Sequence, residues 1–327
     1  MNIIIPFSDN AGESVGVSIK VNHRYTFLAL PNKTRSKKLE VILSKYYGPC
    51  FGVSSAFEEV INSKKNIKIL GEIAHNQILI NKLKNKKNIK IINDILEVNK
   101  NETVVIRTHG IKIEDFNDLL SKNINIIDKT CPKVKLVQKI AENAEKENKF
   151  FVLIGNAKHP EVIGISSRCK NTFIIDSAKS AKNLFYDIKF ECNNFIVAAQ
   201  TTFDSQEFEK ICQVIKNFNF NVKIYNTICN DSLNRRKEIE LVSNFVDSSI
   251  VLGSKTSSNS KNLFKTAQNF SKYSVFVENP EDFNFDILKN KKRIFITSAA
   301  SVLKETVLDF LNRIHINFKK INLKQII

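Results

Sequence analysis

The chain has 327 residues, of which 43% are hydrophobic and 25% are charged, a composition typical of a globular protein with two or three domains. It contains no apolar run near the ~20 residues of a transmembrane helix, and its first residues make a poor signal peptide, so we expect a cytoplasmic protein without a membrane contact. The formal net charge of +17 suggests nucleic acid or another anionic partner, but the lysines are scattered among many Asn and Ile residues. We therefore interpret this basicity as composition bias and solvated helix faces.

Residues 1–38 precede every motif described below. The stretch "VSIKVNHRYTFLAL" in this segment could form an appended strand. We treat residues 1–38 as an N-terminal extension whose role, docking or regulatory, the sequence does not decide.

A strand, a cysteine and a helix follow one another in "KKLEVILSKYYGPCFGVSSAFEEV", with Cys50 between the strand and the helix. The next apolar strand ends at Gly71 and leads to His75 in "GEIAHN". A third strand, "IKIIND", and a fourth, "TVVIRTHG" with His109, complete the segment. Short apolar strands that alternate with helical segments predict a parallel sheet buried on both faces.

The same order recurs in "NINIIDKTCPKVKLVQKIAENAEK". Pro132 suits the first helical position, which places Cys131 at the helix N-cap, where Ser, Thr, Asp or Asn is the usual residue. The strand in "FFVLIGNAKHPE" then ends at Gly155 and leads to His159. "TFIIDS" supplies the third strand, and "FIVAAQTT" supplies a fourth that ends near Thr201.

The order occurs a third time in "NVKIYNTICNDSLNRRKEIELV", which places Cys229 between a strand and a helix. The strand in "SIVLGSKTSSNS" ends at Gly253 and leads to the polar run Ser257–Asn259, and "SVFVEN" and "RIFITSAAS" with Ser301 follow. A helix is expected to begin near Ser260, so the run would offer hydroxyls, an amide and helix N–H groups to an anion. Taken alone, "SSNS" would be no more than an N-cap and a turn.

The repetition predicts the architecture. The three cysteines are separated by 81 and 98 residues, and a strand-ending glycine follows them after 21, 24 and 24 residues. Ligands of parallel α/β sheets bind beyond the carboxyl ends of the strands, where all these polar motifs lie. We predict an α/β protein of three similar units around a pseudo-threefold axis that carries the chemistry. The predicted units are 39–130, 131–225 and 226–313, followed by a C-terminal tail at 314–327.

The position of Cys50, Cys131 and Cys229 indicates ligands. A helix N-terminus lowers the pKa of a thiol and favours the thiolate, which is the form that binds metals. Three nucleophiles in one site make little chemical sense, whereas three ligands do. A tetrahedral zinc ion with an open position is possible. An iron–sulfur cluster with one iron left free fits an all-sulfur ligand set better.

The other cysteines, Cys169, Cys192 and Cys212, share none of this context. We interpret them as small buried hydrophobic residues, which is the common role of a free cysteine. No CxxC pair occurs in the chain, which argues against a zinc ribbon or a thioredoxin motif.

Nine short motifs together carry a resemblance to a known family. They are "GPCFGV", "GEIAHN", "RTHG", "DKTCP", "HPEVIG", "QTT", "NTIC", "GSKTSSNS" and "TSAAS", and they span roughly residues 39–313 in the family's order. The chain thereby resembles the 4-hydroxy-3-methylbut-2-enyl diphosphate reductases, the last enzymes of the non-mevalonate isoprenoid pathway. Two departures stand out: "GPCFGV" replaces a more usual Gly-Phe-Cys-Ala-Gly, and Asn226 stands where Asp is commoner.

The resemblance implies a trefoil of three α/β units around one 4Fe–4S cluster held by Cys50, Cys131 and Cys229. It also implies an allylic diphosphate substrate and roles for the polar residues at the strand ends. In this interpretation the diphosphate or its neighbourhood is contacted by His75, His109, His159, Ser257, Ser258, Asn259 and Ser301. Thr201 and Glu161 would attend the substrate hydroxyl, with Glu161 as the proton donor.

The resemblance thus predicts an iron–sulfur oxidoreductase that receives electrons singly, from ferredoxin or flavodoxin. No Gly-x-Gly-x-x-Gly fingerprint indicates NAD(P)H binding within this chain. Two alternatives stay open at this point. One is an iron–sulfur dehydratase of a small hydroxy acid, which would want Arg or Lys where this chain has Ser, Asn and His. The other is a basic RNA-binding protein whose cysteines pack its cores.

Overall fold

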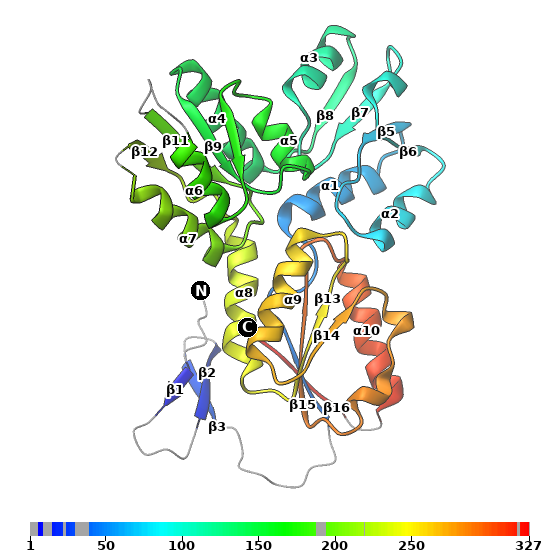
Figure 1. Ribbon diagram of the computed structural model, residues 1–327. Helices are drawn as coiled ribbons and strands as arrows, with labels where there is room; N and C mark the ends of the chain where they lie inside the picture. Colours follow the sequence, from blue (N-terminus) through cyan, green and yellow to red (C-terminus); the bar gives the residue numbers. More distant parts are fainter. Residues whose placement is uncertain are drawn as a thin grey trace.

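The computed structural model describes residues 6–8, 15–21, 24–29, 39–187, 194–218, 220–318 and 321–326. Three α/β lobes, each with its own sheet, surround a common centre (Figure 1). The predicted class is therefore confirmed: three small parallel sheets covered by helices. Among the described residues, no helix has both the length and the hydrophobicity needed to cross a bilayer. The cytoplasmic location stays a prediction.

The first sheet has the strand order β6-β5-β7-β8, and all its neighbours are parallel. Its strands are β5 (Ile67–Leu70), β6 (Ile89–Ile92), β7 (Thr103–Ile106) and β8 (Asn125–Asp128). Its helices are α1 (Phe51–Ile61), α2 (Gln77–Lys84), α3 (Ile113–Ser121) and the short 3-10 turn η1 (Ile95–Glu97). Ile69 packs with side chains of α1 and α2 on one face, and Ile106 packs with Leu119 of α3 on the other. Burial on both faces explains why these strands read as continuous apolar runs.

The second sheet repeats this plan in the order β10-β9-β11-β12, again with parallel neighbours. Its strands are β9 (Phe150–Ile154), β10 (Thr172–Ile175), β11 (Asn194–Ala199) and β12 (Asn221–Ile224). Its helices are α4 (Pro132–Lys146), α5 (Pro160–Ser166), α6 (Ala178–Asp187) and α7 (Ser205–Lys216). Leu153 packs against α4 and α5, whereas Val152 packs on the side of α6 and α7.

The third sheet has five parallel strands in the order β14-β13-β15-β4-β16. The strands are β4 (Leu39–Leu43), β13 (Ser248–Leu252), β14 (Ser274–Val277), β15 (Arg293–Ser298) and β16 (Ile321–Gln325). The helices are α8 (Asn230–Ser243), α9 (Ser258–Phe270) and α10 (Lys304–Asn317), with 3-10 turns η2 (Pro280–Asp282) and η3 (Phe285–Leu288). One cluster of buried side chains from these strands and helices forms the core of the lobe.

Two segments lie elsewhere than the predicted division of the chain implied. Residues 39–43, assigned to the first unit, form β4 in the third sheet, and residues 321–325, assigned to the tail, form its edge strand β16. The physical reason is that each strand–cysteine–helix segment crosses between units. Strands β4, β8 and β12 belong to the third, first and second sheets, whereas the following helices α1, α4 and α8 pack in the first, second and third lobes. The boundaries near 130 and 225 stay predictions.

Part of the N-terminal extension forms a sheet of its own. Strands β1 (Pro6–Ser8), β2 (Val15–Val21) and β3 (Arg24–Ala29) pair antiparallel in the order β1-β2-β3. The stretch expected to form one appended strand is thus two strands that pair with each other, with Val21 opposite Arg24. None of the three pairs with a described strand of the other sheets.

This topology predicts different outcomes for two deletions. Removing residues 1–38 should leave the thermal unfolding of the three-lobed core nearly unchanged, because every described sheet and helix from residue 39 onward remains. Removing residues 1–43 also removes β4, which lies between β15 and β16, and with it the buried side chains of Leu39, Val41 and Leu43. Each lost core side chain lowers the free energy of unfolding by roughly 2–5 kcal/mol. The protein that lacks residues 1–43 should therefore not unfold cooperatively. Circular dichroism melts of both proteins test the assignment, and equal melts would contradict it.

Candidate active site

The carboxyl ends of the three sheets meet at a small cavity. A cavity of about 110 Å³ lies there, lined by residues from all three lobes. Every residue that the sequence and the resemblance single out borders it: Cys50, His75, His109, Cys131, His159, Glu161, Thr201, Cys229, Ser257, Ser258, Asn259 and Ser301. Parallel strands of equivalent units bring their ends together in this way because ligand-binding loops follow the strands.

The three cysteines occupy equivalent positions. Cys50, Cys131 and Cys229 are the N-cap residues of α1, α4 and α8, and each is half-buried. Their backbone N–H groups donate to the carbonyl groups of Ala300 (3.1 Å), Thr108 (2.9 Å) and Thr201 (2.8 Å), in that order. These carbonyls belong to the loops after β15, β7 and β11, which pair with β4, β8 and β12. The strand pairing therefore continues up to each cysteine and fixes its backbone.

The turn before Cys50 depends on a glycine. Gly48 has a φ of 84°, which L-residues with a Cβ rarely adopt, and its N–H donates to the Ser298 hydroxyl over 2.8 Å. An added Cβ would also lie 2.5 Å from a side-chain carbon of Lys304. The Gly-Pro-Cys sequence thus produces a tight turn into α1, although it departs from the sequence that is usual in the family.

The thiols differ from the expectation in their acidity. Burial raises the pKa of the Cys50 thiol to about 11 and also raises that of Cys131, although nearby helix N–H groups oppose the change. The expectation that the helix N-terminus favours the thiolate is therefore wrong for these two residues in the protein alone. At both thiols the loss of hydration on burial outweighs the partial positive charge of the helix N-terminus.

Three histidines form a compact cluster on one side of the cavity. His75 stacks on His109 with ring centroids 5.0 Å apart, and His159 meets both edge-on at 5.7 and 5.3 Å. Burial lowers the pKa of His109 well below its usual range and that of His159 to about 4. The mutual repulsion of the rings and Arg107 act in the same direction. Both rings are therefore neutral near pH 7.

Glu161 is a buried carboxyl group with a defined partner. It is 1% exposed, and it accepts hydrogen bonds from the backbone N–H (2.6 Å) and the hydroxyl (2.9 Å) of Thr201. Its own N–H donates to Nδ1 of His159, the N-cap of α5, over 3.2 Å. Burial raises the pKa of Glu161 to about 7, because two hydrogen bonds compensate only part of the lost hydration. A substantial fraction of this carboxyl group is thus protonated at neutral pH.

The polar run of the third lobe faces the cavity with unused donors. Helix α9 begins at Ser258, two residues earlier than expected, because the Ser257 hydroxyl caps it by accepting from the N–H of Ser260. The Asn259 amide oxygen accepts from Ser232 over 3.0 Å, whereas its amide nitrogen has no partner among the described residues. The buried hydroxyl of Ser301 likewise lacks one within the described ranges. Buried donors without partners indicate that a ligand supplies the acceptors.

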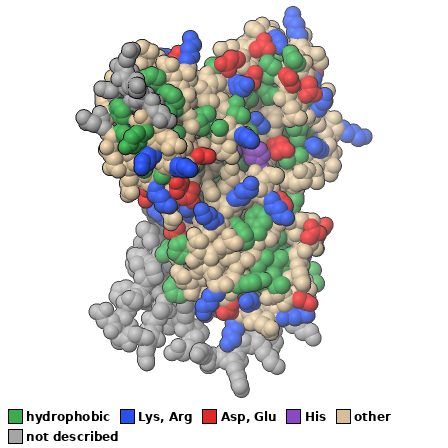
Figure 2. All heavy atoms as spheres, viewed as in Figure 1, with side chains coloured by type: hydrophobic (Ala, Val, Ile, Leu, Met, Phe, Trp, Pro, Cys, Tyr) green, Lys and Arg blue, Asp and Glu red, His purple; other side chains and the backbone are tan. Residues whose placement is uncertain are grey.

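Two charged residues that line the cavity escaped the sequence analysis, Lys133 and Asp231. Each lies two residues after a cysteine, in the first turn of α4 or α8. Their common spacing from the cysteines could have identified them as cavity residues from the sequence. His75 also borders a second, larger groove between the first and third lobes, and Figure 2 shows a histidine at the surface in the hollow between lobes.

Two of the three remaining cysteines lie where the sequence predicted. Cys169 and Cys212 are 3% and 9% exposed and belong to the two hydrophobic clusters of the second lobe. Cys192 lies outside the described residues.

Fold and cavity together define a class: a three-lobed α/β protein with one cysteine from each crossover at a shared polar cavity. A family model described as "LytB protein" matches residues 41–315. The chain belongs to the LytB family.

Relatives named "4-hydroxy-3-methylbut-2-enyl diphosphate reductase" are similar over most of their length. The protein of Campylobacter hominis is 34% identical over 264 residues, which cover 80% of this chain and 94% of the relative. The protein of Helicobacter pylori strain Shi470 is 36% identical over 265 residues, covering 80% and 94%. The solved structure of the "E-1-hydroxy-2-methyl-but-2-enyl-4-diphosphate reductase from Plasmodium falciparum" superimposes with a TM-score of 0.78 at 28% identity, covering 88% of this chain and 92% of that one.

The raised pKa of Glu161 predicts a pH dependence of stability. Between the usual carboxyl pKa of 4.5 and about 7, the folded protein retains a proton that the unfolded chain releases. The free energy of unfolding of the wild type should therefore fall as the pH rises through this interval, by on the order of 3 kcal/mol relative to Glu161→Gln, and level off above it. Urea denaturation of both proteins at pH 4.5 and pH 8 measures this difference. Parallel changes in the two proteins would show that Glu161 titrates normally.

Proposed function

We propose that this protein reductively removes the hydroxyl group of (E)-4-hydroxy-3-methylbut-2-enyl diphosphate and releases isopentenyl and dimethylallyl diphosphate. The names of its relatives support this assignment at the level of the family. The observation that carries it in this chain is one cavity that combines three cysteines, unpartnered neutral donors and a buried carboxyl group near its titration point. The three features correspond to the reacting centre, the diphosphate end and the proton source.

The donor set fits a 4Fe–4S cluster held by Cys50, Cys131 and Cys229. A single zinc ion would hold three sulfurs roughly 3.8 Å apart. Within the described residues, however, the one group of His, Cys, Asp or Glu placed closely enough to hold a single metal ion is the histidine cluster, whose ligand atoms lie within 4.8 Å of one another. Three thiols that share a cavity without gathering at one point suit a cluster with one thiolate on each of three irons. Bound iron would also supply the positive charge that deprotonates thiols which burial keeps neutral.

When bound, such a cluster supplies a Lewis-acidic iron for the substrate hydroxyl and a path for single electrons. The protein's own residues set the orientation. The hydroxyl of Ser301, the amide nitrogen of Asn259 and the N-terminus of α9 form an anion site for the diphosphate. The histidine cluster lies beside the same cavity, where its rings can donate to phosphate oxygens. Binding at this end places the hydroxyl end towards the cysteines.

Glu161 is the proton donor in this proposal. Removing the hydroxyl as water requires a proton, and a carboxyl group with a pKa of about 7 can hold and deliver one at neutral pH. Thr201 fixes both carboxyl oxygens, so the group keeps one orientation in the cavity wall. The electrons would come singly from ferredoxin or flavodoxin.

The alternatives have less support. A dehydratase of small hydroxy acids needs a cation for the carboxylate, but the lysine that lines the cavity, Lys133, is exposed, and the buried lining offers neutral donors. An RNA-binding protein would not require three cysteines at equivalent helix ends to face one cavity. On the face drawn in Figure 2, lysines and arginines lie dispersed among acidic and apolar residues.

The ligand assignment predicts which thiols retain iron. Single Ser substitutions of Cys50, Cys131 or Cys229 should abolish or destabilise the cluster, because serine is a poorer ligand for iron than a thiolate. Cys212→Ser is the matched control and should retain iron and sulfide, since Cys212 packs in the core of the second lobe. Iron and acid-labile sulfide analysis of anaerobically purified proteins measures both. A folded Cys212→Ser protein that loses its iron would contradict the assignment.

The role of Glu161 predicts a slow but intact variant. Glu161→Gln keeps the size and polarity of the side chain but cannot donate a carboxylic proton, so turnover should fall about 10²–10⁴-fold at unchanged iron content. In the wild type, turnover should also fall as the pH rises above about 7, where the carboxyl group loses its proton. Steady-state rates with a dithionite-reduced dye, at matched cluster content, test both statements. A variant within threefold of the wild type would exclude Glu161 as the proton donor.

A further inference from the structure

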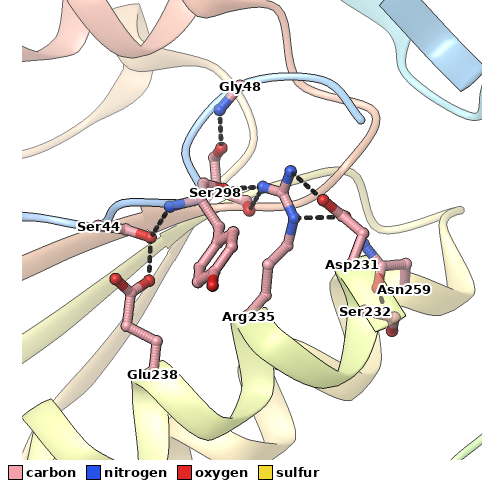
Figure 3. Close-up of polar contacts among 9 residues, drawn as sticks. Ser44, Gly48, Asp231, Ser232, Arg235, Glu238, Asn259 and Ser298 are labelled. Carbon is pink, nitrogen blue, oxygen red and sulfur yellow. Dashed lines mark hydrogen bonds and ion pairs between the residues drawn. The ribbon is translucent and has the colours of Figure 1, made fainter. Parts of the chain in front are cut away.

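Helix α8 carries a buried arginine close to the cavity. Arg235 lies six residues after Cys229 and is 2% exposed. Its Nε donates to the carboxylate of Asp231 over 2.8 Å, and Nη2 reaches the same carboxylate at 3.3 Å. Its Nη1 donates to the carbonyl oxygens of Tyr46 and, over 2.8 Å, Ser298 (Figure 3). One guanidinium therefore joins α8 to two loops that are distant in the sequence.

A second residue of α8 holds the same loop. The buried carboxylate of Glu238 accepts from the Ser44 hydroxyl and, over 2.8 Å, from the N–H of Lys45. Ser44 in turn accepts from the N–H of Tyr46 over 3.0 Å. Arg235 and Glu238 are neighbours on one face of α8, so the turn after β4 is attached to this helix at two points (Figure 3).

Both loops that Arg235 contacts lead directly to site residues. The loop of Tyr46 continues to Cys50, and the loop that starts at Ser298 continues to Ser301. They are also bonded to each other, from the N–H of Gly48 to the Ser298 hydroxyl and from the N–H of Cys50 to the Ala300 carbonyl. Cys229 is the N-cap residue of α8 itself. The guanidinium thus connects the segments that carry Cys50, Cys229 and the Ser301 hydroxyl, which we assign to the anion site.

The equivalent positions of the other two lobes are apolar. The residues six positions after Cys50 and Cys131 are Ala56 and Val137, both 0% exposed and packed in hydrophobic clusters. The architecture therefore does not require a charge at this position. Burying a guanidinium is costly unless its donors are satisfied, and replacing it by an apolar residue is often tolerated for stability alone. An arginine here indicates a role beyond packing.

We propose that Arg235 is a positioning residue that sets the separation of Cys50 and Cys229 and holds the Ser301 loop in register with them. The cluster-related part of this inference rests on the proposed function. The third lobe needs this brace because β4, which leads into the Cys50 turn, comes from the beginning of the core, whereas the other strands of its sheet come from the end of the core. The remaining two crossovers connect sheets that are consecutive in the chain.

The first test uses the full-length, metal-free protein and does not depend on a cluster. In Arg235→Lys the charge remains, but one amine cannot reach Asp231, Tyr46 and Ser298 together. Loss of hydrogen bonds to a charged group should open the turn, so that an alkylating reagent labels Cys50 about ten- to a hundredfold faster, with Cys131 unchanged. Peptide mass spectrometry measures both rates in each protein.

Arg293→Lys is the matched control. This arginine starts β15 at the opposite end of the sheet, where it donates to Glu40 over 3.3 Å and to the Phe245 carbonyl over 3.1 Å. Because Arg293 makes no hydrogen bond with the described residues of the turn before Cys50, Arg293→Lys should leave the labelling of Cys50 unchanged. If Arg235→Lys does not fold, Asp231→Asn serves instead, because it weakens the carboxylate contact that orients the Arg235 guanidinium and leaves the arginine in place. Cys50 labelling within twofold of the wild type in the folded variant would overturn the proposal.

The second test follows the reconstituted cluster. A chelator should remove iron from Arg235→Lys about tenfold faster than from the wild type or Arg293→Lys, since one ligand loop is less constrained. Equal release rates would overturn the role of Arg235 towards the cluster. A wild-type protein that binds no iron at all would instead refute the proposed function, and the labelling result would still decide whether Arg235 positions Cys50.

Discussion

The parallel pairing of β4 with β15 is the constraint on which the rest of the molecule depends. It inserts the first strand of the core into the last sheet, with Arg293 opposite Glu40 and Ile296 opposite Leu43, and so closes the three lobes into a ring. Only a closed ring makes the three crossovers equivalent. Each cysteine can then continue the pairing of its own strand through one backbone hydrogen bond to the neighbouring loop. The shared cavity is a consequence of that closure.

The closed ring creates a competition between burial and charge inside the cavity. Burial keeps thiols protonated at Cys50 and Cys131, keeps His109 and His159 uncharged, and leaves Glu161 near its titration point. Each of these shifts disfavours the charged form, because burial removes hydration from the group. Several of the ionisable side chains that line the cavity are therefore uncharged in the protein alone. Such a lining suits a bound cationic metal group and a bound anionic ligand whose charges compensate each other.

Local features of the fold could be predicted from the sequence, and non-local ones could not. The apolar strands and the N-cap position of Cys131 follow from periodicity and from Pro132, which act within a few residues. Strand β4 was assigned to the first unit, whereas it belongs to the third sheet. Its partner β15 lies some 250 residues later, and nothing in "KKLEVILS" predicts that pairing. The acidity of Cys50 was misjudged for the same reason, since burial comes from residues distant in the sequence. Nothing in the local sequence distinguishes Arg235 from an ordinary helix residue, because its partners Tyr46 and Ser298 lie far away in the chain.

The pseudo-threefold frame also explains why the three lobes differ where they face the cavity. The first lobe contributes histidines, the second a histidine with the Glu161–Thr201 pair, and the third hydroxyls and an amide. The proposed substrate, with a diphosphate at one end and a hydroxyl at the other, has no threefold symmetry, so identical lobes could not bind it in one orientation. Symmetry in the backbone places three equivalent sulfurs, and divergence in the loops distinguishes the two ends. The buried charge of Arg235 belongs to that divergence, because the lobe to which we assign the anion must also hold its loop in register with the cysteines.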